Sequence, residues 1–207
     1  MKVKIFSRKN RPPMIIPVFI PHMGCPHRCL FCNQNIVTSS RVIHTEDIKK
    51  IVHSYLSWKS IKRKKIELSF YGGSFTALPE KTMKEYIKTG EKIIDGTEVD
   101  CLRCSTRPDA ISHKKAEYLK NHNFHTVELG VQSFSDRLLS EMKRGHDSNS
   151  VIKAFHILKE KGLSVCYQFM TGFPGETLKD IEISIETLKK YTPDFVRIYP
   201  FAPLPEA

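Results

Sequence analysis

No segment of the 207-residue sequence is long and apolar enough to cross a membrane. The apolar stretch nearest the N-terminus covers only residues 14–20, contains Pro17 and is followed directly by Pro21. Although residues 1–11 are basic, this pattern is not that of a signal peptide with its longer apolar centre. We therefore expect no association with a membrane.

Acidic residues are scarce relative to basic ones. Lys and Arg number 33 against 22 Asp and Glu, which gives a formal net charge of +11. Such an excess attracts phosphate groups at long range and favours acidic partners such as nucleic acid. A solvated, lysine-rich surface produces the same composition, so charge alone does not identify a substrate. With 40% hydrophobic residues, the chain can bury a core as one globular domain.

The cysteines do not have the pattern of a disulfide framework. Cys25, Cys29 and Cys32 lie within eight residues of one another, a spacing that is more typical of metal binding. We therefore expect a reducing compartment, the cytoplasm.

A second C-x2-C spacing occurs at Cys101 and Cys104, but no further cysteine pair is present to complete another site. Residues three apart on a strand face opposite sides. We therefore interpret these two cysteines, and Cys166, as ordinary partly buried thiols.

Apolar runs rich in β-branched residues alternate with segments of helical spacing. We predict a helix after Thr45, with Thr45 as its N-cap, and a helix that Gly162 ends in the left-handed conformation. The predicted strands cover residues 15–20, 66–71, 99–105, 124–130, 163–170 and 195–199. The helix that Gly162 ends covers residues 151–158, and the other predicted helices cover residues 79–94, 112–121 and 178–188.

Strands separated by helices indicate a parallel sheet, because parallel neighbours need crossover connections. No G-x-G-x-x-G follows the first strand, so we predict an α/β fold with a partial (β/α)6 TIM-type barrel rather than a doubly wound open sheet. In such barrels the functional groups follow the carboxyl ends of the strands. The segments expected at this mouth are residues 25–32, 72–74, 105–107, 132–133 and 171–175.

The cysteine segment CPHRCLFC has the spacing C-x3-C-x2-C. One short loop of this kind can bind three irons of a [4Fe–4S] cluster through Cys25, Cys29 and Cys32. The fourth iron is then open to the amino and carboxylate groups of S-adenosylmethionine, and one electron can break a carbon–sulfur bond and release a 5′-deoxyadenosyl radical. The alternative is a zinc site completed by His22 or His27.

With these motifs, the chain resembles the radical S-adenosylmethionine (radical SAM) superfamily and, within it, proteins similar to the catalytic subunit of Elongator. The resemblance runs from about residue 17 to residue 199. It is carried by residues 24–34 (GCPHRCLFCNQ), 128–133 (ELGVQS), 144–146 (RGH) and 172–175 (GFPG).

The resemblance implies cofactor-binding roles near the cysteine loop. Phe31 corresponds to an aromatic residue that packs near the adenine. Residues Gly72, Gly73 and Ser74 occupy the position of the family's Gly-Gly-Glu motif, which holds the methionine ammonium, and here serine replaces the acid. A Gly-Gly pair is otherwise typical of a tight turn.

Further roles follow for residues after the later strands. Ser105 and Arg107 correspond to groups near the ribose or the methionine carboxylate, although an arginine there can also be a surface ion pair. Gln132 and Arg144 are twelve residues apart, as is a ligand-contacting pair in the oxygen-independent coproporphyrinogen oxidases. Gln132 would then bind the ribose and Arg144 the carboxylate. For Arg144 the alternative is a surface position at a helix end.

Two residues are expected inside the barrel. Gln168 occupies a position that is acidic in those oxidases and is expected to face the ribose hydroxyls. Glu128 is interpreted either as a ribose contact or as a buried structural ion that needs a partner.

The expected organisation is a basic lead-in at residues 1–14, a radical SAM core at residues 15–200 and a short tail at residues 201–207. Relatives continue past the sixth strand, so we expect a core that is truncated there and lacks the acetyltransferase domain of Elongator. The expected function is reductive cleavage of S-adenosylmethionine, with tRNA as substrate and ferredoxin or flavodoxin as electron donor. The alternatives are a non-catalytic iron–sulfur protein and a zinc-stabilised RNA-binding module.

Overall fold

The computed structural model describes residues 13–20, 25, 29–32, 43–58 and 65–202. Most of the expected basic lead-in, residues 1–12, lies outside the described residues, as do residues 203–207 of the expected tail. His22 and His27, the residues proposed to complete a zinc site, also lie outside them.

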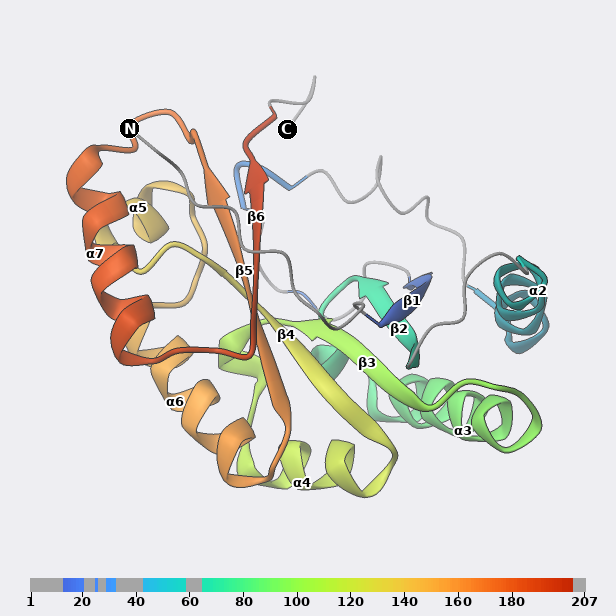
Figure 1. The fold of residues 1–207 in the computed structure, drawn as a ribbon. Helices are drawn as coiled ribbons and strands as arrows, with labels where there is room; N and C mark the ends of the chain where they lie inside the picture. Colours follow the sequence, from blue (N-terminus) through green and yellow to red (C-terminus); the bar gives the residue numbers. More distant parts are fainter. Residues whose placement is uncertain (1–12, 21–24, 26–28, 33–42, 59–64, 203–207) are drawn as a thin grey trace.

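A single parallel sheet forms the centre of the protein (Figure 1). Its strands follow the order of the chain, each hydrogen-bonded to the next, so the sheet curves into a half-barrel with β1 and β6 at its two edges. The strands are β1 (Met14–Ile20), β2 (Ile66–Gly72), β3 (Cys101–Thr106), β4 (Phe124–Gln132), β5 (Ser164–Thr171) and β6 (Phe195–Pro200). The predicted six-stranded parallel half-barrel is confirmed.

Helices connect successive strands and lie along the outer face of the sheet (Figure 1). They are α2 (Thr45–Leu56), α3 (Glu80–Gly96), α4 (His113–Asn121), α6 (Ser148–Glu160) and α7 (Leu178–Lys190). All five were predicted. Among the described helices, none combines the length and the apolar character needed to span a membrane.

The sequence did not predict the short elements η1 (Phe75–Ala77), η2 (Pro108–Ala110) and α5 (Asp136–Glu141). These elements are too short to show a helical hydrophobic period. They lie in the loops that follow β2, β3 and β4, so they shape the mouth of the half-barrel.

The predicted start of the first helix at Thr45 is confirmed but its predicted N-cap was wrong, and one predicted helix end is confirmed. Thr45 is the first residue of α2, and His44 is the N-cap, with its backbone amide donating to the Asp47 carboxylate over 3.3 Å. The Asp47 carboxylate, three residues into the helix, accepts from the His44 amide, and Thr45 is not the N-cap that the sequence predicted. Gly162, with φ of +67°, follows α6 in the left-handed region that glycine adopts without strain.

The two faces of the sheet differ in chemistry because side chains alternate along each strand. Leu68 and Phe70 of β2 and Val127 and Leu129 of β4 are fully buried in the main apolar core, together with residues of the outer helices. The intervening residues face the concave side and are largely polar. The sheet therefore separates an apolar layer under the helices from a polar interior.

The cysteines on the strands are free and buried, as the sequence indicated. Cys104 belongs to the main apolar core, whereas Cys101 points to the concave side and contacts Glu67 over 3.9 Å. Burial, followed by the charge of Glu67, raises the pKa of Cys101 to about 11. Burial and the charge of Glu128 raise the pKa of Cys166 to about 12. These thiols stay protonated at neutral pH.

Candidate cofactor site at the barrel mouth

One cavity lies at the carboxyl ends of the strands, where the loops after β1 to β4 meet Gln168 of β5; residues 171–175, also expected at the mouth, are not among its lining residues. Most of its lining residues come from the segments that the sequence places at the mouth. They are Cys25, Cys29, Phe31, Cys32, Gly72, Gly73, Ser74, Ser105, Thr106, Arg107, Gly130, Gln132, Arg144 and Gln168. The structure thus brings together every predicted site residue except Glu128.

The cysteine loop covers one side of this cavity. A backbone hydrogen bond of 3.0 Å from Cys32 to Cys29 closes a turn, and another of 3.1 Å from Leu30 to Met142 attaches the loop to the end of α5. No group of three His, Cys, Asp or Glu among the described residues is arranged to hold a single metal ion. A [4Fe–4S] cluster does not need three side chains to meet at one metal ion, because each of its three thiolates binds a different iron.

Two arginines donate to the cysteine sulfurs. Arg107 Nη1 lies 3.5 Å from Cys25 Sγ, and Arg144 Nη1 lies 3.5 Å from Cys29 Sγ. Both side chains are buried, with exposed fractions of 3% and 8%, so neither is a surface arginine. Cations held this close stabilise thiolates and the negative charge of a thiolate-bound cluster.

Each arginine is fixed by a second contact. Arg107 donates to both carboxylate oxygens of Asp109, over 3.0 and 2.8 Å. Burial opposes the charge of Arg107, but Asp109 and Cys25 outweigh this effect and raise its pKa. Arg144 Nη2 donates to the Gly130 carbonyl over 2.7 Å, whereas its Nε has no partner among the described atoms. A buried donor without a partner is costly unless a ligand satisfies it.

The glycine pair at the end of β2 also lines the cavity. Gly72 has φ of +103°, a conformation that side chains with a Cβ rarely adopt. Ser74 is buried, and its Oγ lies 2.9 Å from Thr106 Oγ1 and accepts from the Arg107 amide over 3.1 Å. The residue that replaces the family acid therefore joins the loops after β2 and β3.

The end of β4 is irregular at the cavity. The register with β5 shifts between Gly130 and Gln132, and Gln132 has φ of +69°. A residue other than glycine in this region costs about 1–3 kcal/mol and is typical of functional sites. A Cβ on Gly130 would lie 2.7 Å from Arg144 Nη2, so the absence of a side chain there lets the guanidinium reach Cys29.

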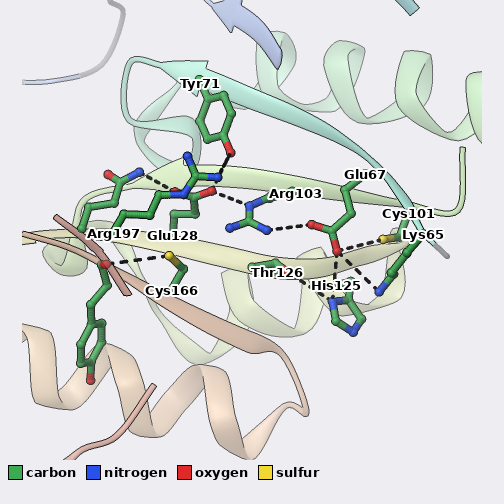
Figure 2. A network of polar contacts seen from close by, with 12 residues as sticks. Lys65, Glu67, Tyr71, Cys101, Arg103, His125, Thr126, Glu128, Cys166 and Arg197 are labelled. Atoms are coloured by element: carbon green, nitrogen blue, oxygen red, sulfur yellow. Dashed lines mark hydrogen bonds and ion pairs between the residues drawn. The ribbon is translucent and has the colours of Figure 1, made fainter. Parts of the chain in front are cut away.

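Glu128 lies beneath the cavity rather than in its wall, so the predicted ribose contact differs from its observed position. Its fully buried carboxylate accepts hydrogen bonds from Tyr71 Oη over 2.6 Å and from Gln168 Nε2 over 2.6 Å. It also pairs with Arg103 over 2.5 Å and with Arg197 over 3.4 Å (Figure 2). The structure thus matches the alternative interpretation, a buried ion with partners.

In this polar network the two buried carboxylates, Glu67 and Glu128, pair with three cations, Lys65, Arg103 and Arg197. Arg103 lies between Glu128 and Glu67, which it contacts over 2.8 Å (Figure 2). Burial opposes the charge of Arg103, but these carboxylates and Tyr71 outweigh it and raise its pKa. Burial, followed by the charge of Glu128, raises the pKa of Tyr71, which therefore donates as a neutral phenol.

Comparison with known proteins identifies the family of the chain. Residues 19–188 match the family model of the Radical SAM superfamily. The chain belongs to this superfamily. Its members are described as enzymes of several kinds.

Sequence relatives of the radical SAM chain include proteins named for tRNA modification. The chain is 32% identical over 199 residues to an uncharacterised protein of Methanocaldococcus jannaschii; the match covers 89% of the chain and 60% of the relative. It is 35% identical over 156 residues to the tRNA uridine(34) acetyltransferase of Methanocaldococcus infernus, covering 66% of the chain and 29% of the relative. The chain therefore spans less than two thirds of these relatives.

Solved structures share the fold. The Elp3 of Methanocaldococcus infernus superposes with a TM-score of 0.69 at 24% identity, over 93% of this chain and 46% of that one. Coproporphyrinogen III oxidase from Escherichia coli, described as a radical SAM enzyme, gives a TM-score of 0.67 at 20% identity, over 95% of this chain and 45% of that one. These two structures, from the two groups of proteins that the sequence resembles, thus share the half-barrel fold of this chain.

Sequence reasoning missed several residues around the radical SAM cavity. Thr106 and Gly130 line it, and Tyr71, Arg103 and Arg197 form the network below. A signal was present, because Tyr71 lies on the same face of β2 as Glu67, and Arg103 lies on the same face of β3 as Ser105. Polar residues at alternating positions of buried strands indicate a polar interior.

Proposed function

We propose that the chain binds a [4Fe–4S] cluster through Cys25, Cys29 and Cys32 and cleaves S-adenosylmethionine reductively. The observation that carries this proposal is the meeting of three thiols with polar groups from four other strand ends in one cavity. Family membership supports it independently.

The donor set of the cavity fits the cluster. Three thiols suit the iron sites of a cubane, and the guanidinium groups of Arg107 and Arg144 offset the negative charge near Cys25 and Cys29. When bound, the cluster supplies one electron that splits S-adenosylmethionine into methionine and a 5′-deoxyadenosyl radical. The described residues position the cofactor for this step.

The remaining lining residues would hold S-adenosylmethionine. The backbone of Gly72 and Gly73 lines the cavity and would bind the methionine ammonium. Arg144, whose Nε has no partner among the described atoms, is suited to the carboxylate. Gln132, Gln168 and Ser105 offer polar contacts to the ribose, and Phe31 offers a ring to the adenine. Ser74 supplies no carboxylate, so we propose that the backbone binds the ammonium.

We further propose tRNA as the substrate and a reduced ferredoxin or flavodoxin as the electron donor in the cytoplasm. Support for tRNA comes from the net charge of +11 and from the relatives named tRNA uridine(34) acetyltransferase.

The test is formation of 5′-deoxyadenosine by anaerobically reconstituted protein with dithionite, with and without bulk tRNA. We expect product from the native chain and from Cys101→Ala, a matched change at a buried cysteine outside the cavity, and none from Cys29→Ala. Iron and sulfide analysis accompanies the assay. Protein with four irons and four sulfides that forms no 5′-deoxyadenosine would contradict cleavage, and one zinc without sulfide would contradict the cluster.

A further inference from the structure

The concave side of the half-barrel carries aromatic rings that the cofactor cavity does not use. We propose that Phe19, Tyr71 and Tyr199, together with Arg197, form a stacking surface for one base of a single-stranded RNA substrate. This inference rests on the proposed function in one respect, namely that the substrate is RNA.

The aromatic residues meet across the sheet. Phe19 of β1 pairs in register with Tyr71 of β2, and their ring centroids lie 6.2 Å apart. The guanidinium of Arg197 on β6 lies 5.7 Å from the centre of the Tyr71 ring, and its Nη2 donates to Tyr71 Oη over 3.3 Å. Its Nη1 donates to Tyr199 Oη over 3.4 Å. The concave curvature thus joins β1 and β2 to β6 through side chains.

Phe19 and Tyr199 remain accessible, whereas Tyr71 is only partly exposed. The exposed fractions of Phe19 and Tyr199 are 51% and 40%, large values for aromatic side chains on the strands of a barrel. Isolated exposed apolar residues are ordinary, but connected rings around an arginine are the usual surface on which unpaired bases stack. Arginine adds a flat cation that stacks on bases and donates to their oxygens.

The stacking surface adjoins the proposed cofactor cavity. Tyr71 directly precedes Gly72, which lines the cavity, and Arg197 pairs in register with Gln168, another lining residue. Tyr71 and Arg197 both contact Glu128 (Figure 2). Glu128 also accepts from Gln168. A base stacked here would therefore lie beside the cavity rather than on a remote surface.

A nucleic-acid occupant agrees with the charge of the chain. The net charge of +11 attracts the phosphates that flank a base, whereas a neutral apolar partner would gain nothing from it. An unpaired base can reach a concave surface that a double helix cannot enter.

The test uses fluorescence anisotropy with two labelled seven-residue oligoribonucleotides at one fixed salt concentration. One has a single uridine at its centre and abasic positions elsewhere, and the other is fully abasic. We expect Phe19→Ala and Tyr199→Ala each to weaken binding of the uridine probe by about tenfold. Neither change should affect the abasic probe or the salt dependence, because the phosphate contacts persist.

Two control variants complete the design. Trp58→Ala removes an exposed ring on the described segment after α2, with 66% exposure, and should leave both probes unaffected. Tyr199→Phe keeps the ring and should retain most of the affinity. Equal binding of the two probes by the native chain, or equal losses for both probes in the alanine variants, would overturn the inference. Formation of 5′-deoxyadenosine is measured separately, without RNA. A failure to cleave S-adenosylmethionine is therefore distinguished from a failure of base stacking.

Discussion

Gln168 Nε2 donates to Oε2 of Glu128 over 2.6 Å. An ionised carboxylate only accepts hydrogen bonds, so this contact fixes which end of the amide faces it. The amide oxygen of Gln168 is then directed away from Glu128, and the residue lines the cavity. In the proposed site, this buried charge would orient Gln168 as an acceptor for a ligand hydroxyl without itself touching the ligand.

The first prediction concerns Glu128→Gln. An amide can donate as well as accept, so the orientation of Gln168 is no longer fixed, and Arg103 loses one of its two carboxylates. We expect weaker binding of S-adenosylmethionine, measured by calorimetry on reconstituted protein, and a loss of about 3–5 kcal/mol in unfolding free energy, measured with urea.

Glu67→Gln is the matched control, because Glu67 pairs with the same arginine but has no contact with Gln168. It should lower stability in the same way and leave the affinity for S-adenosylmethionine unchanged. If both variants lose affinity for S-adenosylmethionine equally, Glu128 stabilises the fold but does not position Gln168. Gln168→Ala tests the same contact in a stable background.

A second prediction uses the close approach of Gly130 and Arg144. In Gly130→Ala the new Cβ would lie 2.7 Å from Arg144 Nη2 and 3.3 Å from Gln132 Nε2, the far ends of two side chains, so the guanidinium moves while the backbone stays. We expect near-native thermal stability but a lower iron content after anaerobic reconstitution, because Cys29 loses its cationic neighbour. Gly96→Ala, where nothing lies within 4 Å of the new Cβ, should retain the native iron content.

The sequence predicted the half-barrel well because each strand carries recurring apolar residues and each helix has a clear period. It predicted the cavity because residues after parallel strands meet at one edge. It could not place Glu128, since the period of a strand shows which face a residue occupies but not how far below the mouth it lies. Nor could it find the contact between Tyr71 and Arg197, which depends on the curvature of the whole sheet.

A third prediction concerns Tyr167, which is fully buried and whose hydroxyl has no hydrogen-bond partner among the described atoms. Tyr167→Phe removes this unsatisfied group and should raise the unfolding free energy by about 1 kcal/mol. Tyr86→Phe is the control, because Tyr86 Oη donates to the Ile43 carbonyl over 3.4 Å and its loss should not stabilise the protein. Urea unfolding measures both; a destabilised Tyr167→Phe would indicate a partner for the hydroxyl.

The last prediction separates the two groups of cysteines by alkylation. Thiolates react with iodoacetamide, and burial raises the pKa of Cys101 to about 11 and that of Cys166 to about 12. In folded, cluster-free protein at pH 7, mass spectrometry should find Cys25 and Cys32 modified first, because both are partly exposed. Cys101, Cys104 and Cys166 should react only after unfolding in urea.

Reconstitution with iron and sulfide should then protect the cysteine loop from alkylation and leave the reactivity of the other three cysteines unchanged. Modification of Cys101 as fast as that of Cys25 would contradict the buried position of β3, whereas an unprotected loop in reconstituted protein would contradict cluster binding there.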